Sequence, residues 1–180
     1  MTENSAEDSV SSGTGSDIGP ILGFLVLRLW LGIRAVVTGI EKFAGQKASE
    51  VAVEVDGEAN DYGLTASDSE KVYGFGNYNG VPEALYEQLE AEPLIPGFAL
   101  KLYDIALGPL LIITGLTLLL GIASRISLFV MGVIYSSLTV GLILLKQDGG
   151  IAWLAIHVLL VSVALFYVQY NRCQIFAKKL

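Results

Sequence analysis

The chain has 180 residues, of which 53% are hydrophobic, and it combines a mean hydropathy of +0.59 with a formal net charge of −7. This composition excludes an ordinary water-soluble domain with a half-polar surface, and the acidic balance excludes attraction to nucleic acid. Cys173 is the single cysteine, which excludes an internal disulfide and a thiolate metal site, so any redox chemistry needs a borrowed cofactor.

Residues 1–17 form an acidic tail rich in serine and glycine. The tail has too little apolar content to bury a core, and we predict that it is disordered. It contains no lysine or arginine, and the apolar run that follows it is long enough to span a membrane, so it is not typical of a secretory signal. We therefore expect the first apolar segment to stay in the mature protein.

Four apolar segments follow, each close to the 20 residues that cross a bilayer as a helix. They are apolar on every face, whereas a soluble bundle keeps one polar face. The sequence therefore predicts an all-α fold, an integral membrane four-helix bundle in one domain over residues 18–180. The predicted spans are Ile18 to Ile40, Phe98 to Ile122, Ile126 to Leu145 and Ile151 to Val168.

The insert between the first two spans, residues 41–97, is strongly acidic, with twelve carboxylates against three lysines. Its first part, Gln46 to Lys71, lacks clear periodicity and is predicted to be loop or irregular structure. An aromatic, glycine-rich stretch follows, residues 73–80, which fits either an ordered loop at the membrane interface or a lid over a ligand. Pro82 then opens a short helix through Leu89, predicted to lie on the membrane surface.

Orientation follows from the positive charges near the helix ends. An even number of spans places both termini on one side, and the rule leans toward cytoplasmic termini. We expect a multi-pass protein of the inner, or plasma, membrane with the 41–97 insert outside. The charges on the terminal side are Arg125, Arg172, Lys178 and Lys179, and those on the insert side are Lys42, Lys47, Lys101 and Lys146.

Small residues repeat along one face of the first span, at Gly32, Ala35 and Gly39, and along the second, at Gly108 and Gly115. Such stripes allow helix backbones to approach closely in a membrane. We interpret them as helix-packing positions. A second copy of the chain can use the same stripe, so a homo-oligomer is a further hypothesis.

Ionisable side chains near helix centres are costly in a bilayer and need a partner or water. Counted from the insert side, Arg34, Asp104 and His157 each lie about six residues inward, roughly 9 Å below that surface. A cation, a carboxylate and an imidazole at one level suit a quinone head group, whose reduction also takes up protons. We predict these three as catalytic residues, with a membrane quinone as cofactor and a redox partner protein. The predicted cofactor-binding residues are Arg28, Tyr103 and Tyr73.

Several alternatives stay open. Arg34 and Asp104 can form a structural ion pair that fixes helix register, with His157 bonded to a backbone carbonyl. The chain can instead be a non-catalytic scaffold that binds an external partner through its acidic, aromatic insert. A small-solute permease ranks last, because no inverted repeat or pair of broken helices is evident. A metal site is not predicted, since one histidine and one aspartate are too few ligands.

The motif order resembles that of the DoxX and DoxD-like membrane proteins. The first span carries Arg28-Leu-Trp-Leu-Gly32 and then Gly39-Ile-Glu-Lys42-Phe43, and the similarity continues over residues 81–132. Asp104 stands where that family usually has glutamate. The resemblance implies a four-helix integral membrane protein related to the membrane subunit of thiosulfate:quinone oxidoreductase.

Overall fold

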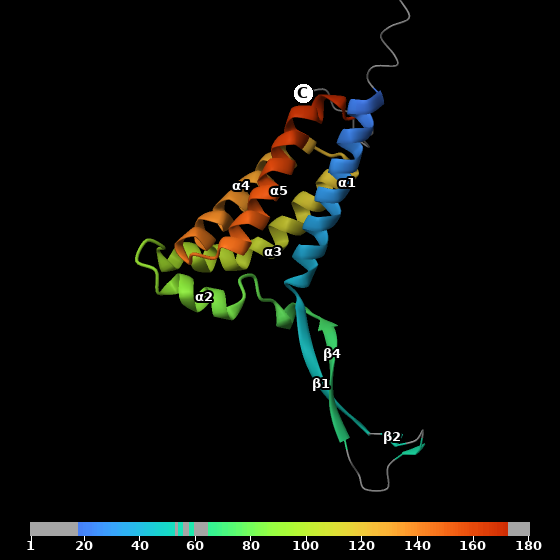
Figure 1. Cartoon of the computed structure of the whole chain (residues 1–180), viewed down its shortest axis with the longest axis vertical. Helices are drawn as coiled ribbons and strands as arrows, with labels where there is room; N and C mark the ends of the chain where they lie inside the picture. The colour runs from blue at the N-terminus through green and yellow to red at the C-terminus, as the bar shows by residue number, and fades with distance from the viewer. Residues whose placement is uncertain (1–17, 53, 56–57, 60–64, 173–180) are drawn as a thin grey trace, which may run out of the picture.

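The computed structural model describes residues 18–52, 54–55, 58–59 and 65–172, and the tail predicted to be disordered, residues 1–17, lies outside them. Four long helices form one bundle, and a β-ribbon extends away from one end of it (Figure 1). The helices are α1 (Ile18–Glu41), α3 (Gly97–Leu120), α4 (Ser124–Leu144) and α5 (Asp148–Tyr167).

All four helices are long and apolar enough to cross a membrane, which confirms the predicted spans to within a few residues at each end. Their outward faces carry large apolar side chains that water would not favour, such as Val26, Phe129 and Phe166, which are 66%, 63% and 74% exposed. A bilayer is the solvent that suits such a surface, because every backbone polar group inside a helix is already paired. The chain is a multi-pass membrane protein.

Glycines bring α1 and α3 into close contact. A Cβ atom added to Gly39 would lie 2.9 Å from the carbonyl oxygen of Gly108, and one added to Gly115 would lie 2.9 Å from that of Gly32. No side chain separates the two backbones at these points. The predicted role of the stripe in helix packing is confirmed, and its use between two copies remains a prediction.

The connections on the two sides of α4 are tight. Gly121 ends α3 with a left-handed φ of 73°, and its N–H group bonds to the carbonyl oxygen of Leu118. Ala123, with a φ of 47°, precedes α4, and Lys146, with a φ of 54°, lies in the turn to α5. Short turns make neighbouring helices antiparallel around a core of fully buried side chains, among them Leu31, Leu111, Leu128, Met131 and Val161.

The insert differs from its prediction. Strand β1 (Ala44–Ala52) pairs antiparallel with β4 (Thr65–Tyr73), and the short strands β2 (Glu54–Val55) and β3 (Glu58–Ala59) pair with each other. The prediction of loop or irregular structure over Gln46 to Lys71 was wrong for these strands, and the fold is not purely α-helical. Pattern analysis missed the ribbon because it does not cover an apolar core, so its strands carry no alternation of apolar and polar residues.

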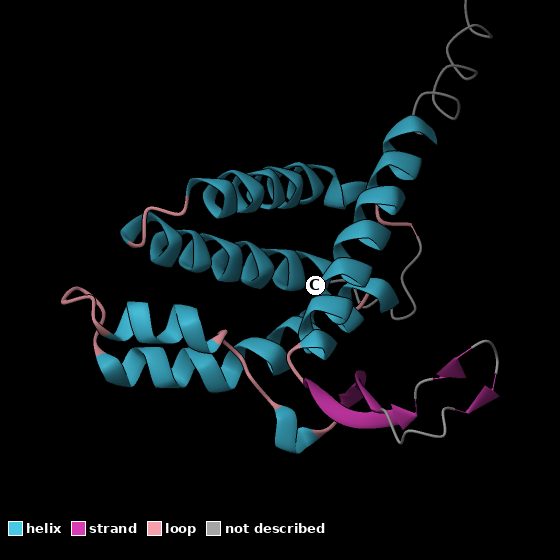
Figure 2. Ribbon diagram, turned by 60° about the horizontal axis from the view of Figure 1, so that its bottom comes forward, coloured by secondary structure: helices cyan, strands magenta, loops and turns pink. Residues whose placement is uncertain are grey.

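After the ribbon, the 3-10 turn η1 (Phe75–Asn77) and the helix α2 (Glu83–Glu90) lead back to α3. The aromatic stretch packs on Phe43, whose ring centroid lies 5.7 Å from that of Phe75 and 4.8 Å from that of Tyr78. Helix α2 lies beside the first turns of α3 (Figure 2) and packs Leu85 and Leu89 against the core. The predicted short helix is confirmed, whereas its position at a membrane surface remains a prediction.

Candidate functional site

The structure brings together two of the three predicted catalytic residues. Arg34 on α1 and His157 on α5 both approach the ring of Trp153, which also lies on α5. The Arg34 Cζ atom lies 5.8 Å from the Trp153 ring centroid, which is cation–π distance. The ring centroids of Trp153 and His157 are 5.3 Å apart, as are those of Tyr135 and His157. We call Arg34, Tyr135, Trp153 and His157 the Trp153 cluster.

The imidazole of His157 has a defined hydrogen bond. Its Nδ1 atom lies 2.9 Å from the backbone carbonyl oxygen of Trp153, one helical turn earlier. A carbonyl oxygen only accepts, so Nδ1 carries the proton and Nε2 is the basic nitrogen of the neutral ring. The alternative in which His157 bonds to a backbone carbonyl is therefore confirmed for this nitrogen. The ring is only 4% exposed, so the helices around it fix its orientation.

Arg34 contributes a positive charge inside the bundle. Within the described part of the chain it makes the contact with Trp153 but no hydrogen bond or ion pair. It lies close enough to Tyr135 for its charge to act on that phenol. A guanidinium at this depth costs about 2.5 to 3.5 kcal/mol on insertion scales unless it finds a partner or water. The Trp153 cluster thus offers N–H donors that suit a carbonyl oxygen or an anion.

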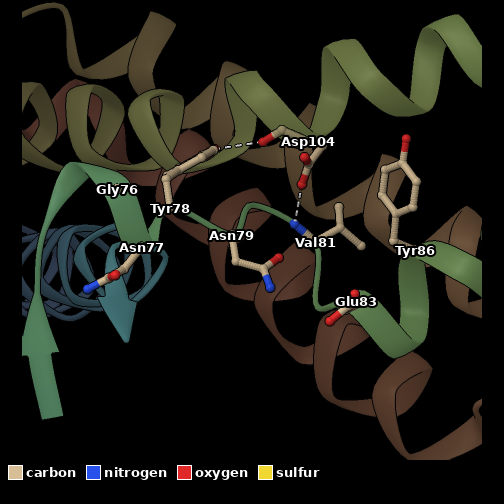
Figure 3. Close-up of a pocket in the computed structure, with 8 residues that line it drawn as sticks. All are labelled: Gly76, Asn77, Tyr78, Asn79, Val81, Glu83, Tyr86 and Asp104. Carbon is tan, nitrogen blue, oxygen red and sulfur yellow. Dashed lines mark hydrogen bonds between the residues drawn. The ribbon is translucent and has the colours of Figure 1, made fainter. Parts of the chain in front are cut away.

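Asp104 does not join this cluster. Its Oδ1 atom accepts the backbone N–H of Val81 at 2.7 Å (Figure 3). Among the described residues, Asp104 makes no ion pair with Arg34. A Cβ atom at Gly80 would lie 1.9 Å from the Asp104 carbonyl oxygen, so only glycine lets the loop approach α3 this closely. The structure therefore separates Asp104 from Arg34 and His157, the two residues predicted to share one site with it. Counting residues gives the depth of a side chain along a helix but not its direction around the helix axis.

Tyr78 holds the same loop against α3. Pro109 lacks the N–H group that would bond to the carbonyl oxygen of Ile105 in a regular helix. The Tyr78 hydroxyl lies 3.0 Å from that oxygen and 2.7 Å from the carbonyl oxygen of Asp104, and it accepts the N–H of Gly108 at 3.1 Å. One hydroxyl thus bonds three backbone groups around the proline. A pocket of about 430 Å³ lies beside this junction, lined by polar residues such as Asn79 (Figure 3).

An apolar cavity of about 480 Å³ lies between α2 and the bundle, and we call it the α2 cavity. Its wall includes Leu85 and Leu89 of α2, Leu107 of α3 and Leu154 of α5. Trp153 belongs to both sites, because it lines the α2 cavity and is also the ring that Arg34 and His157 approach. The volume falls within the range of about 300 to 1,000 Å³ that small-molecule sites occupy.

Polar groups line the α2 cavity at two places. The Tyr103 hydroxyl lies 3.0 Å from Ser137 Oγ and 3.2 Å from the carbonyl oxygen of Ile134. Lys42, which follows α1 directly, is the other. Burial lowers the pKa of Lys42, and the negative charge of Asp104 opposes that shift.

Two predicted cofactor-binding residues lie elsewhere. Arg28 is buried at the opposite end of the bundle, where Nε and Nη2 donate to the carbonyl oxygens of Leu118 and Leu119 at 2.8 and 2.7 Å, and Nη1 donates to Asn171 Oδ1 at 3.0 Å. Arg28 thus bonds carbonyl oxygens at the C-terminus of α3, away from the Trp153 cluster. The Tyr73 hydroxyl donates to Glu41 Oε1 at 2.9 Å at the foot of the ribbon.

At that foot Lys71 also donates to Glu41, and this hydrogen bond raises the pKa of Lys71 above its ordinary value of 10.5.

Sequence reasoning missed Trp153, Tyr135 and Lys42 as site residues. The available signal was the four-residue spacing of Trp153 and His157, which places both on one face of a helix. In the described ranges, no group of three or more His, Cys, Asp or Glu residues is placed to hold a metal ion.

The fold and these sites define a multi-pass membrane protein in which the Trp153 cluster and the α2 cavity share Trp153. Comparisons with protein-family models, with curated proteins and with solved structures found no match. The resemblance to the DoxX and DoxD-like proteins therefore remains a prediction that rests on the motifs alone.

Proposed function

We propose that this protein is the membrane subunit of a quinone-linked oxidoreductase system, and that the head group of the quinone binds at the Trp153 cluster. The observation that carries the proposal is the approach of Arg34 and His157, from two different helices, to one aromatic ring. Electrons would come from a redox partner protein, and the quinone would take up two electrons and two protons.

Each residue of the cluster has a role that fits its geometry. The N–H groups of Arg34, which make no hydrogen bond within the described ranges, can donate to a quinone carbonyl oxygen. The exposed face of Trp153, 51% accessible, can stack against a flat ring. His157 can hold or release a proton at Nε2, because Nδ1 is bonded to the Trp153 carbonyl oxygen.

Asp104 has a different role in this proposal from the one predicted from its depth. Its bond to the Val81 N–H makes it a positioning residue for the loop that carries Tyr78. Removing the charge of Asp104 would directly affect the position of the loop and the electrostatic environment of Lys42. Any effect on a quinone at Arg34 would be indirect. Tyr103 lines the α2 cavity and is not one of the four residues of the Trp153 cluster, so this proposal does not place it at the head group.

The test is to purify the intact protein in mild detergent and to measure bound isoprenoid quinone by mass spectrometry. We expect near-stoichiometric quinone in the wild type and loss of about tenfold or more in Arg34→Gln and His157→Phe, because each loses a polar contact worth more than 1.4 kcal/mol. The matched control is Arg125→Gln, at an exposed arginine in the first turn of α4. A folded wild type that retains no quinone, or variants that bind it normally, would overturn the proposal.

The ribbon favours a second function, that of a scaffold for an external partner. Its strands pair only with each other among the described residues, and it extends from the end of α1 away from the helices (Figure 1). Gly45 and Val72 face each other in the ladder, so residues 46–71 can be replaced by a two-residue turn that leaves Tyr73 and Tyr78 in place. The scaffold function predicts that this deletion releases a co-purifying partner while bound quinone is unchanged.

Location in the inner, or plasma, membrane with cytoplasmic termini also belongs to this proposal. The balance of lysine and arginine around the spans supports it, and an insert on the outer side would meet a partner there. Reporter domains fused to the C-terminus and inserted at residue 60 should be active on opposite sides of the membrane. Activity of the C-terminal fusion on the outer side would reverse the orientation.

A further inference from the structure

The α2 cavity is mainly apolar, and it differs in character from the Trp153 cluster. Its lining follows α2 from Val81, just before the helix, to Leu89 in its last turn. Leu89 also reaches α4, because its Cδ2 atom lies 3.5 Å from the position that a Cβ atom on Gly141 would occupy. Most of the other lining side chains are aliphatic, so the wall favours a hydrocarbon chain.

Lys42 supplies the charge at one end of this cavity. It is half-buried, and within the described ranges its ammonium group forms no hydrogen bond or ion pair. Asp104 is the carboxylate whose field reaches it, and Oδ1 of Asp104 is already occupied by the Val81 N–H. A half-buried ammonium without a contact partner gains most from an anion that brings oxygen atoms within hydrogen-bond distance.

A mainly apolar volume lined by one cation matches one class of molecule. A double-chain phospholipid matches this cavity less well because it carries a second chain. A quinone matches it less well because its head group carries no negative charge that Lys42 would select. We infer that the α2 cavity binds a single-chain lipid with an anionic head group, whose chain lies under α2 and whose head group pairs with Lys42. The head group can be a carboxylate, as in a fatty acid, or a phosphate, as in a lysophospholipid. This inference does not depend on quinone binding.

The location supports this assignment. Lys42 directly follows α1, at the level where the spanning helix gives way to the insert, so a charged head group there can remain partly hydrated. Pro82, just before α2, and Leu85 of α2 would cover the chain from the insert side, whereas Leu107 and Leu154 would contact it from the bundle. The lipid would thus complete the packing between α2 and the three helices beneath it.

The test uses the full-length protein in nanodiscs of a neutral phospholipid. The probe is palmitic acid that carries a photoreactive diazirine near the end of its chain, and crosslinked peptides are mapped by mass spectrometry. We expect labelling within residues 82–100 and 137–154, competition by unlabelled palmitic acid, and at least tenfold weaker competition by its methyl ester, which has the same chain without the charge. Stronger competition by lysophosphatidic acid than by palmitic acid would support the inference and assign phosphate as the preferred head group.

Two variants separate the head-group contact from the chain site. Lys42→Met keeps the length of the side chain and removes the charge, and it should weaken the acid about tenfold while leaving the ester unchanged. Ala99→Phe projects a ring into the cavity and should abolish labelling by both. The matched control is Lys101→Met, at an exposed lysine near the start of α3. Equal competition by the acid and the ester in the wild type, which requires no variant to fold, would overturn the inference.

Quinone content in the same samples distinguishes this inference from the proposed function. Lys42→Met and Ala99→Phe should retain quinone if both proposals hold, because neither residue belongs to the Trp153 cluster. Loss of lipid labelling with retained quinone assigns the lipid to the α2 cavity. Labelling that persists in Ala99→Phe places the lipid elsewhere and contradicts the inference.

Discussion

The hydroxyl group of Tyr78 lies 3.0 Å from the carbonyl oxygen of Ile105, the oxygen that Pro109 leaves without a helical partner. A residue of the insert thus completes the hydrogen bonding of a membrane-spanning helix. The same hydroxyl contacts the Asp104 carbonyl oxygen and the Gly108 N–H. The proline in α3 and the tyrosine in the loop therefore act as a pair, and neither can be understood from its own segment.

Tyr78→Phe should destabilise the protein by about 1 to 3 kcal/mol, because it removes the hydroxyl and leaves backbone polar groups of α3 unpaired. Thermal unfolding in detergent, followed by circular dichroism, measures the effect. The matched control is Tyr86→Phe, whose hydroxyl forms no hydrogen bond within the described ranges. Equal melting temperatures for the two variants would contradict the role of Tyr78.

Arg28→Gln should cost about 1.5 to 3 kcal/mol or more, because the Leu118 and Leu119 carbonyl oxygens lose a charged donor at the C-terminus of α3. Asn171→Ala should cost less, since it removes only the amide that links Arg28 to Ser124. Chemical unfolding in mixed micelles gives both values. Because the two side chains bond to each other, we expect the double variant to be less destabilised than the sum of the single variants.

Gly115→Ala should weaken the contact between α1 and α3, since the added methyl group would lie 2.8 Å from Val36 Cγ2 and 2.9 Å from the Gly32 carbonyl oxygen. The helices must move apart, and we expect a lower melting temperature. Gly23→Ala is the control, because a Cβ atom there meets nothing within 4 Å, and alanine is favoured over glycine inside a helix by about 0.5 to 1 kcal/mol. The two substitutions should therefore act in opposite directions.

The stability of the contact between Lys71 and Glu41, at the foot of the ribbon, should fall at alkaline pH. The hydrogen bond that Lys71 donates to Glu41 raises the pKa of Lys71 above 10.5, so this contact contributes its full stability below pH 10.5 and loses it as the pH rises through the raised pKa. NMR titration of the labelled Lys71 Cε carbon should give a midpoint above 10.5. In Glu41→Gln the midpoint should fall back toward 10.5, and an unchanged midpoint would show that the carboxylate does not act on Lys71.

The spans and the glycine contacts were predictable from the sequence because they depend on composition and on spacing along one helix. Arg34 and His157, which counting along the helices put at one level, both approach the Trp153 ring. Asp104 was not assigned its partner, since the direction of a side chain around a helix depends on how neighbouring helices rotate. The same limit applies to Arg28, whose partners include carbonyl oxygens, and any residue type supplies a carbonyl oxygen.

The ribbon and the Trp153 cluster were beyond sequence reasoning for different reasons. Strands that cover no core show no apolar alternation, so the pairing of Ala44 with Tyr73 leaves no pattern to find. Trp153 was not selected because a tryptophan in an apolar span is ordinary, and its contacts with Arg34 and His157 become apparent only when α1 and α5 are placed side by side.

The bond between Arg28 and Asn171 joins the first helix to the residue that follows the last one. During synthesis, α1 enters the membrane while the α3 carbonyl oxygens and Asn171 have not yet left the ribosome. The guanidinium must then remain near water or with the insertion machinery, because an isolated arginine is costly in lipid. The first helix therefore reaches its final position only after the last helix has been made. A ribosome stalled before residue 171 would leave the first helix inserted but without the bond from Arg28 to Asn171.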